Sequence, residues 1–124
     1  MLVSPSLLIT DDDRAFRETL QTVFEPRGFR TLLAADGTEA LQIVNSTEIH
    51  LVLMDMHMPR LSGIETINQI KQRQSRLPCI LMSAQLDDEM RACSKAFCVL
   101  SKPISFNELT STVHAALRAT YDWA

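Results

Sequence analysis

Five polar residues that can bind a cation or transfer a chemical group each stand at the end of a short apolar run. They are Asp11 and Asp12, Asp55, Ser83 and Lys102. A charge at the end of a buried strand costs free energy unless something pairs with it. Carboxylates bind hard divalent cations, and a carboxylate can also act as a nucleophile. These residue types therefore predict a site where a metal ion and a transferred group meet.

The elements that must position these residues alternate along the chain. Apolar runs of strand length are followed by amphipathic stretches of helical period, with residues such as Phe16 and Leu20 expected on the inward face of the first helix. Most of the apolar runs are continuous, which is typical of parallel strands covered on both faces. The pattern predicts a doubly wound α/β fold of flavodoxin-like type, with five helices and a five-stranded sheet in the order 2-1-3-4-5. The expected strands are 7–10, 29–35, 51–55, 78–84 and 97–100, and the expected helices start near Arg14, Asp36, Ile64, Leu86 and Ser105.

This strand order brings the polar residues together. The first strand lies beside the third at ~4.8 Å, so Asp11, Asp12 and Asp55 should form one cluster. Three adjacent acids repel one another and hold protons unless a cation lies between them, and Lys102 can balance only one of the charges. Oxygen ligands of this kind favour Mg²⁺, with Mn²⁺ as a substitute. Asp55 is then placed to attack phosphorus.

Each member of the set also has an ordinary structural interpretation. Asp13 is expected to cap the first helix, and Asp12 could do the same. Ser83 could be a turn residue, and Lys102 could be a solvated charge. The occurrence of all these residues at strand ends favours a functional site over the separate explanations.

The composition limits the classes of function. The 124 residues are 46% hydrophobic and 22% charged, with a net charge of −3. Such a chain is expected to fold as one domain over 1–124, with a core of about 7–118 and with 119–124 as a tail or the start of a linker. The acidic balance argues against direct binding to nucleic acid, and no apolar run is long enough to cross a membrane. We therefore expect a cytoplasmic protein.

Four motifs in this order resemble the receiver domain of two-component response regulators, over almost the whole chain. The resemblance implies a CheY-like fold and a bacterial phosphorelay protein. The motifs are Leu8-Ile9-Thr10-Asp11-Asp12-Asp13, Met54-Asp55-Met56-His57-Met58-Pro59 followed by Gly63, Met82-Ser83-Ala84, and Ser101-Lys102-Pro103.

The resemblance assigns a role to each group that would touch a phosphoryl group. It implies that Asp55 accepts phosphate from a sensor histidine kinase or a phosphotransfer histidine in a Mg²⁺-dependent reaction. Lys102 would contact the bound phosphoryl group, and the hydroxyl of Ser83 would swing towards it. We expect a signalling switch that phosphorylates and dephosphorylates itself slowly, and not a turnover enzyme.

The resemblance also implies a ligand set for the metal. Asp12, Asp55 and the backbone carbonyl of His57 would hold Mg²⁺ directly, and Asp11 would act mainly through water. The side chains of His57 and Gln85 are expected to border the site entrance and to affect how fast water removes the phosphate.

The expected output face departs from the family pattern. Receivers change shape on the fourth helix, fifth strand and fifth helix, which here correspond to about 86–117 and could bind an output domain or a second copy. The family has Tyr or Phe three residues before the lysine, whereas this chain has Val99. Phe97 is two residues too early on the same strand, and we expect it in the core. An aromatic ring flipping inward therefore cannot carry the signal.

Three other functions are weighed against this one. A receiver-like interaction module that works without phosphate is favoured by Val99 and opposed by the complete acid set. An aspartyl phosphatase would need a second acid where this chain has His57. Flavin binding is opposed by Asp11, Asp12 and Asp13, which would repel a phosphate after the first strand.

Overall fold

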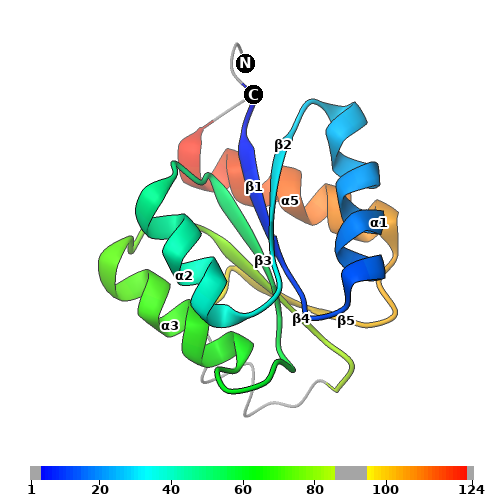
Figure 1. Ribbon diagram of the computed structural model, residues 1–124. Coiled ribbons are helices and arrows are strands. Elements are labelled where there is room, and N and C mark those ends of the chain that lie inside the picture. The colour runs from blue at the N-terminus through cyan, green and yellow to red at the C-terminus, as the bar shows by residue number, and fades with distance from the viewer. Residues whose placement is uncertain (1–3, 86–94, 123–124) are drawn as a thin grey trace.

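A five-stranded parallel sheet forms the centre of the computed structural model, which describes residues 4–85 and 95–122 (Figure 1). The strand order is β2-β1-β3-β4-β5, as the sequence predicts. Leu8 is paired with Leu32 on one side and with Val52 on the other, which places the first strand between the second and the third. The strands are β1 (Ser6–Thr10), β2 (Arg30–Ala34), β3 (Leu51–Asp55), β4 (Cys79–Ser83) and β5 (Cys98–Ser101).

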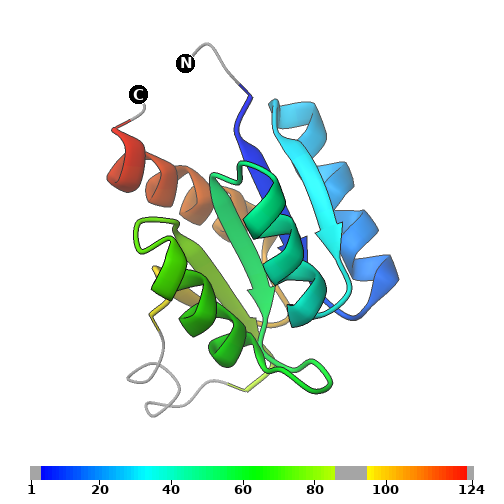
Figure 2. The ribbon, with the colours of Figure 1, turned by 60° about the vertical axis from the view of Figure 1, so that its left-hand side comes forward.

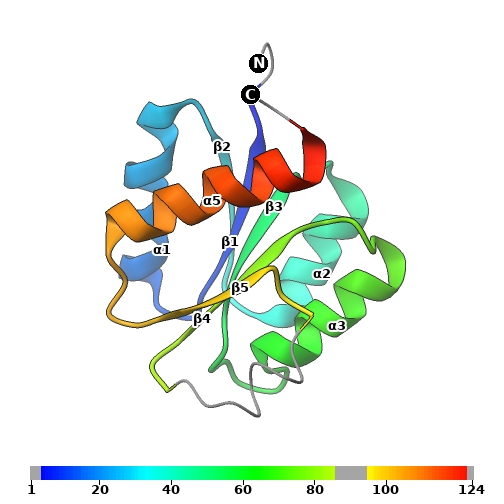
Figure 3. The same ribbon diagram turned by 180° about the vertical axis from the view of Figure 1, so that it is seen from behind.

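Helices cover both faces of the sheet. In Figure 2, α2 and α3 lie in front of the sheet, whereas Figure 3 shows α1 and α5 on the opposite side. The fourth expected helix, around Leu86, Met90 and Cys93, lies outside the described residues. The helices are α1 (Arg14–Phe24) with the short 3-10 turn η1 (Glu25–Arg27), α2 (Gly37–Ser46), α3 (Gly63–Arg73) and α5 (Phe106–Tyr121).

The alternation of side chains along the strands creates two core layers. Leu7 and Ile9 belong to the layer under α1 and α5, and Leu8 belongs to the layer under α2 and α3. Successive residues of a strand point to opposite faces, so a continuous apolar run fills both layers at once. All five residues of β1, β3 and β4 are buried.

Local signals set the start of the first and third helices. The carboxylate of Asp13 accepts hydrogen bonds from the backbone N–H groups of Ala15 and Phe16, which confirms its expected role as a helix cap. Ser62 and Glu65 form a reciprocal capping box at α3. These caps fix where each helix leaves the edge of the sheet at which the strands end.

The last helix continues beyond the expected core limit near 118. The Tyr121 hydroxyl donates to the backbone carbonyl of His50 at 2.7 Å, and the guanidinium of Arg76 donates to the carbonyl of Thr120 at 2.8 Å. These bonds hold the end of α5 against the start of β3 and the loop before β4. Among residues 4–85 and 95–122, no helix is long and apolar enough to cross a bilayer.

The expectation that Phe97 lies in the core is wrong. Its backbone N–H donates to the carbonyl of Cys79, so the residue is paired with β4, but it is 45% exposed. It lies directly before β5, which is an edge strand with a neighbouring strand on one side only. An apolar residue type alone does not distinguish an edge position from a central one.

Replacement of Gly63 with Ala should destabilise the fold, because a Cβ atom there would overlap the backbone carbonyl oxygen of Asp55 and lie 2.8 Å from the Cα of Met56. We expect a loss of about 2 kcal/mol in the free energy of unfolding, measured by urea denaturation. Gly28→Ala is the comparison, because Gly28 has a φ of 92° but open space around it, and should lose only about 1 kcal/mol. Equal losses at the two positions would contradict the proposed overlap.

Candidate functional site

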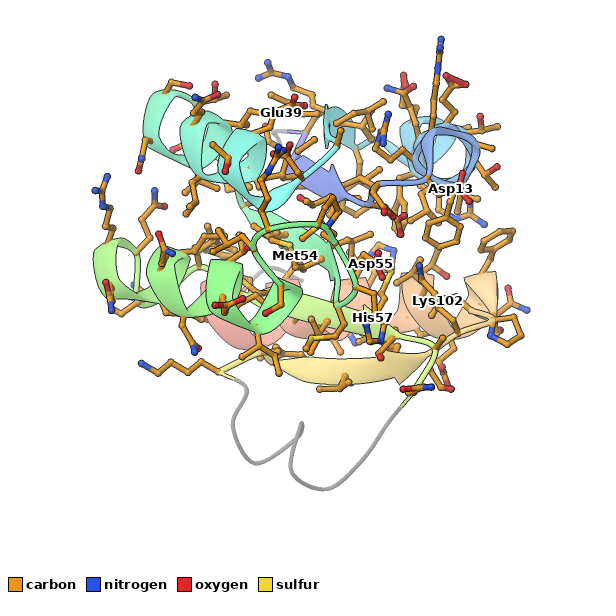
Figure 4. All side chains as sticks on the ribbon, turned by 60° about the horizontal axis from the view of Figure 1, so that its bottom comes forward. Asp13, Glu39, Met54, Asp55, His57 and Lys102 are labelled. Carbon is orange, nitrogen blue, oxygen red and sulfur yellow. The ribbon has the colours of Figure 1, made fainter. Side chains whose placement is uncertain are left out.

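The ends of four strands deliver polar groups to one edge of the molecule. Figure 4 views this edge and shows Asp55, His57 and Lys102 gathered there, with Asp13 nearby at the start of α1. Asp55 is the last residue of β3 and Ser83 the last of β4, and Lys102 comes directly after β5. Backbone bonds tie these ends together, since Met56 N–H donates to the Met82 carbonyl and Lys102 N–H donates to the Ser83 carbonyl, both at 2.8 Å.

Three carboxylates form the centre of the site. One oxygen from each of Asp11, Asp12 and Asp55 lies within 4.8 Å of the others. Asp11 and Asp55 are buried, whereas Asp12 is exposed. The cluster is therefore fixed on its protein side and open to solvent on the other. Oxygen donors with room for water are the ligand type that Mg²⁺ prefers.

Lys102 is shared between two of these acids. Its Nζ lies 2.9 Å from Oδ2 of Asp11 and 3.2 Å from Oδ1 of Asp55. Burial lowers the pKa of Lys102, but the hydrogen bonds and charges of Asp11 and Asp55 outweigh that effect and raise the pKa above its ordinary 10.5. The side chain therefore stays cationic at neutral pH. It supplies one positive charge against three acids.

The environment of Asp55 disfavours its ionised form. Burial raises the pKa of this carboxyl above 3.8, and the negative charge of Asp11 raises it further. The charge and hydrogen bond of Lys102 and a backbone hydrogen bond from His57 act in the opposite direction but do not cancel the rise. An additional cation would relieve this repulsion, and the donor set fits a divalent metal ion.

The orientation of Asp11 is fixed from three directions. Its Oδ1 accepts the N–H of Asp13 at 2.9 Å, and its Oδ2 accepts Lys102. Its backbone carbonyl accepts Nη1 of Arg17 at 2.6 Å. Sequence reasoning missed Arg17, because a single arginine on an amphipathic helix gives no sign that it reaches back to the preceding strand end. Both carboxylate oxygens of Asp11 therefore already have a hydrogen-bond partner, and its expected contribution to metal binding through water stays a prediction.

The hydroxyl of Ser83 is folded back onto its own loop. It donates to the carbonyl of Gln85 at 2.7 Å and accepts the N–H of Gln85 at 3.1 Å. Nε2 of His57 lies 3.4 Å from the same oxygen. Ser83 is buried, whereas His57 and Gln85 are exposed. His57 thus stands on the solvent side of Ser83, and the effect of His57 and Gln85 on hydrolysis stays a prediction.

Val99 faces the core layer under α2 and α3. It is partly buried and packs against the residues of that layer. Of the expected output face at 86–117, the structure describes residues 95–117, which contain β5 and most of α5. Val99 has no ring and no polar atom that could exchange a hydrogen bond between two positions.

The sequence and the structure both match one family of signalling domains. A family described as the response regulator receiver domain matches residues 7–114. The response regulator MprA of Mycolicibacterium vanbaalenii is 35% identical over 117 residues, which cover 92% of this chain and 51% of that protein. This chain therefore spans about half the length of the curated relatives that it matches.

Solved structures show the same architecture. A signal receiver domain of an HD domain-containing protein from Pseudomonas fluorescens superposes with a TM-score of 0.91 at 27% identity, over 97% of this chain and 99% of that one. The response regulator TrrA from Thermotoga maritima, solved in complex with Mg²⁺ and BeF, superposes with a TM-score of 0.84 at 29% identity, over 91% of this chain and 99% of that one.

Replacement of Asp55 with Asn should raise the thermal unfolding midpoint of the metal-free protein at neutral pH. The pKa of Asp55 is raised on folding, so the folded state binds this proton more tightly than the unfolded state does. The ionised carboxylate therefore destabilises the fold increasingly as the pH rises from 3.8 through the raised pKa, and fully above it. The gap between variant and wild type should widen over that interval in melting curves recorded by circular dichroism with a chelator present.

Asp13→Asn is the matched control, because asparagine caps a helix as well as aspartate does. The gap between this variant and wild type should not follow the same pH interval. A wild type that is more stable than Asp55→Asn at neutral pH would mean that the Lys102 pairing outweighs burial and the charge of Asp11.

Proposed function

Because the chain belongs to the response regulator receiver domain family, we propose that it is a switch in which Asp55 accepts a phosphoryl group. The observation that carries this proposal is the environment of Asp55. Its carboxylate lies 3.2 Å from the ammonium of Lys102, within 4.8 Å of oxygens from Asp11 and Asp12, at the solvent edge of a buried sheet. A nucleophilic carboxylate needs positive charge beside it, here from Lys102 and from a cation bound by the acids, because the incoming phosphoryl group is itself negatively charged.

Receiver domains bind Mg²⁺ at an acidic pocket, and the donor set of this chain fits that ion. We expect Asp12, Asp55 and the backbone carbonyl of His57 to hold it, with Asp11 acting through water. When bound, Mg²⁺ supplies positive charge that offsets the acids and the phosphoryl oxygens. Mn²⁺ would serve in its place, since it takes the same kind of ligand.

The transfer step uses groups that the chain already brings together. A carboxylate oxygen of Asp55 attacks phosphorus, and the bond between phosphorus and the imidazole nitrogen of the donor breaks. The leaving nitrogen keeps the electron pair and takes a proton from water. Lys102 moves its hydrogen bond from the carboxylate to a phosphoryl oxygen, which keeps the new negative charge paired. Attack of water on phosphorus later releases phosphate and restores the carboxylate.

In the phosphorylated form, Ser83 would contact the phosphoryl group. Its hydroxyl would leave the backbone of Gln85 and donate to a phosphoryl oxygen, which pulls the loop after β4 inward. Lys102 N–H is bonded to the carbonyl of Ser83, so this movement would reach the end of β5 directly. We propose that the surface of β5 and α5 then changes its affinity for an output domain or a second copy. The donor would be a histidine of a sensor kinase or of a phosphotransfer protein.

Val99 favours one alternative, a receiver-like module that binds its partner without phosphate. With no ring at this position, the usual aromatic contribution to the switch is missing. The phosphoacceptor switch and the phosphate-independent module predict opposite results when the protein is treated with a small phosphoryl donor. This test can be done without knowing the partner.

Incubation with acetyl phosphate and Mg²⁺ should add one phosphoryl group to the protein, detected as a mass increase by intact-protein mass spectrometry. Asp55→Asn should show no addition, because the amide is not a nucleophile. Asp13→Asn changes the same residue type outside the cluster and should react like wild type. A wild type that stays unmodified would favour the phosphate-independent module, and equal modification of Asp55→Asn would show that another residue is the acceptor.

Replacement of Lys102 with Ala should weaken the binding of beryllofluoride, a mimic of the phosphoryl group, by roughly 10- to 100-fold at saturating Mg²⁺. The affinity for Mg²⁺ itself should stay unchanged or rise, because Lys102 also pairs with Asp11. Both affinities are measurable by isothermal titration calorimetry. Lys71→Ala is the control, since Lys71 lies in the last turn of α3 and its ammonium donates to the carbonyl of Ser75 just after that helix, away from the cluster. A loss of Mg²⁺ affinity in Lys102→Ala would contradict the assigned role.

A further inference from the structure

Lys102 has a third neighbour besides its two carboxylate partners. Its Nζ lies 4.6 Å from the centroid of the Phe16 ring, over the face of the ring. Phe16 is in the first turn of α1, where its N–H is capped by Asp13. The ring is partly buried and packs against the core layer under α1 and α5. Both the helix cap and the core therefore fix the place of this ring beside the acid cluster.

The three neighbours of the ammonium differ in one chemical respect. Asp11 and Asp55 belong to the acid cluster, so a divalent cation bound there, directly or through water, would share their negative charge with Lys102. The face of an aromatic ring attracts an ammonium through its quadrupole but offers no lone pair to a hard cation. Phe16 is thus a partner that Lys102 does not have to share.

This difference matters most when the cluster is occupied. Mg²⁺ would weaken the hold of both carboxylates on Lys102, and a lysine side chain has four flexible methylene groups and a strongly hydrated head. Without another contact, the ammonium would have little free energy to lose by turning away from the cluster into the water on its exposed side. The Lys102 side chain is 25% exposed, so solvent is within reach.

We propose that Phe16 is a positioning residue, whose ring holds the Lys102 ammonium next to Asp55 while the carboxylates are engaged by the metal. This inference rests on the proposed function of Asp55. The ring acts only through Lys102 and touches neither the metal nor the phosphoryl group. Its effect must therefore appear in the binding of the phosphoryl mimic and be absent from the binding of Mg²⁺.

A double-mutant cycle tests the proposal with beryllofluoride at saturating Mg²⁺, by isothermal titration calorimetry. Phe16→Leu keeps an apolar side chain but removes the ring, and should weaken beryllofluoride binding roughly fivefold. The same change made in Lys102→Ala should alter binding by less than about twofold, because the partner of the ring is gone. Phe16→Tyr keeps the ring face and should bind like wild type. The affinity for Mg²⁺ alone should not change in Phe16→Leu.

The control Phe97→Leu makes the same substitution at a 45% exposed ring before β5 and should leave both affinities unchanged. Two results would overturn the positioning role: wild-type affinity for beryllofluoride in Phe16→Leu, or an equal loss in the presence and absence of Lys102. A parallel loss of Mg²⁺ affinity would also overturn it, since that would be a general disturbance of the site. A wild type that binds no beryllofluoride would instead refute the proposed function, so the two failures are distinguishable.

Discussion

Electrostatic crowding at one edge of a buried sheet is the constraint on which the rest of this structure depends. Three carboxylate oxygens lie within 4.8 Å of one another, and Lys102 balances only part of their charge. The parallel topology imposes this crowding, because β1 and β3 are neighbours and both end at the same edge. The two apolar core layers stabilise a sheet that carries such a site. The repulsion that remains favours the binding of a cation, which in the proposed function would also keep Asp55 ionised for attack on phosphorus.

Several contacts limit how the crowded groups can move. Asp11 is held through both its carboxylate and its backbone, by Asp13, Lys102 and Arg17. Lys102 connects the end of β5 to three other strand ends, since its ammonium reaches Asp11 and Asp55 and its backbone N–H bonds to the carbonyl of Ser83. The charged groups and the backbone of Ser83 are therefore connected through Lys102. In the proposed switch, a change in charge at Asp55 would reach β5 through these neighbouring bonds.

Much of the fold and of the candidate site can be predicted from the sequence, because apolar runs and turn residues act locally. The strands 51–55 and 78–84 differ from β3 and β4 by at most one residue at either end, and the cap at Asp13 follows from residue type. The strand order and the meeting of Asp11, Asp12 and Asp55 follow once the sheet is parallel. What could not be predicted depends on side-chain direction in three dimensions. Three features depend on which residue of another element lies next to a side chain, and the pattern of residue types along the chain does not give that information. They are the bond from Arg17 to the carbonyl of Asp11, the ring of Phe16 beside Lys102 and the exposure of Phe97.

The hydrogen bonds of Ser83 have a thermodynamic consequence. Its hydroxyl has a single donor hydrogen, and that hydrogen is already bonded to the carbonyl of Gln85, so a phosphoryl oxygen could accept it only if this bond breaks. In the proposed switch, the hydroxyl would exchange its bond to a neutral carbonyl for a charge-assisted bond to a phosphoryl oxygen, which is roughly twice as strong. Phosphate would thereby favour the second arrangement over the resting one. The degree to which phosphorylation changes the population would then depend on the free-energy difference between the two arrangements in the unphosphorylated protein. That difference would be a property of the loop after β4 and not of the reaction at Asp55.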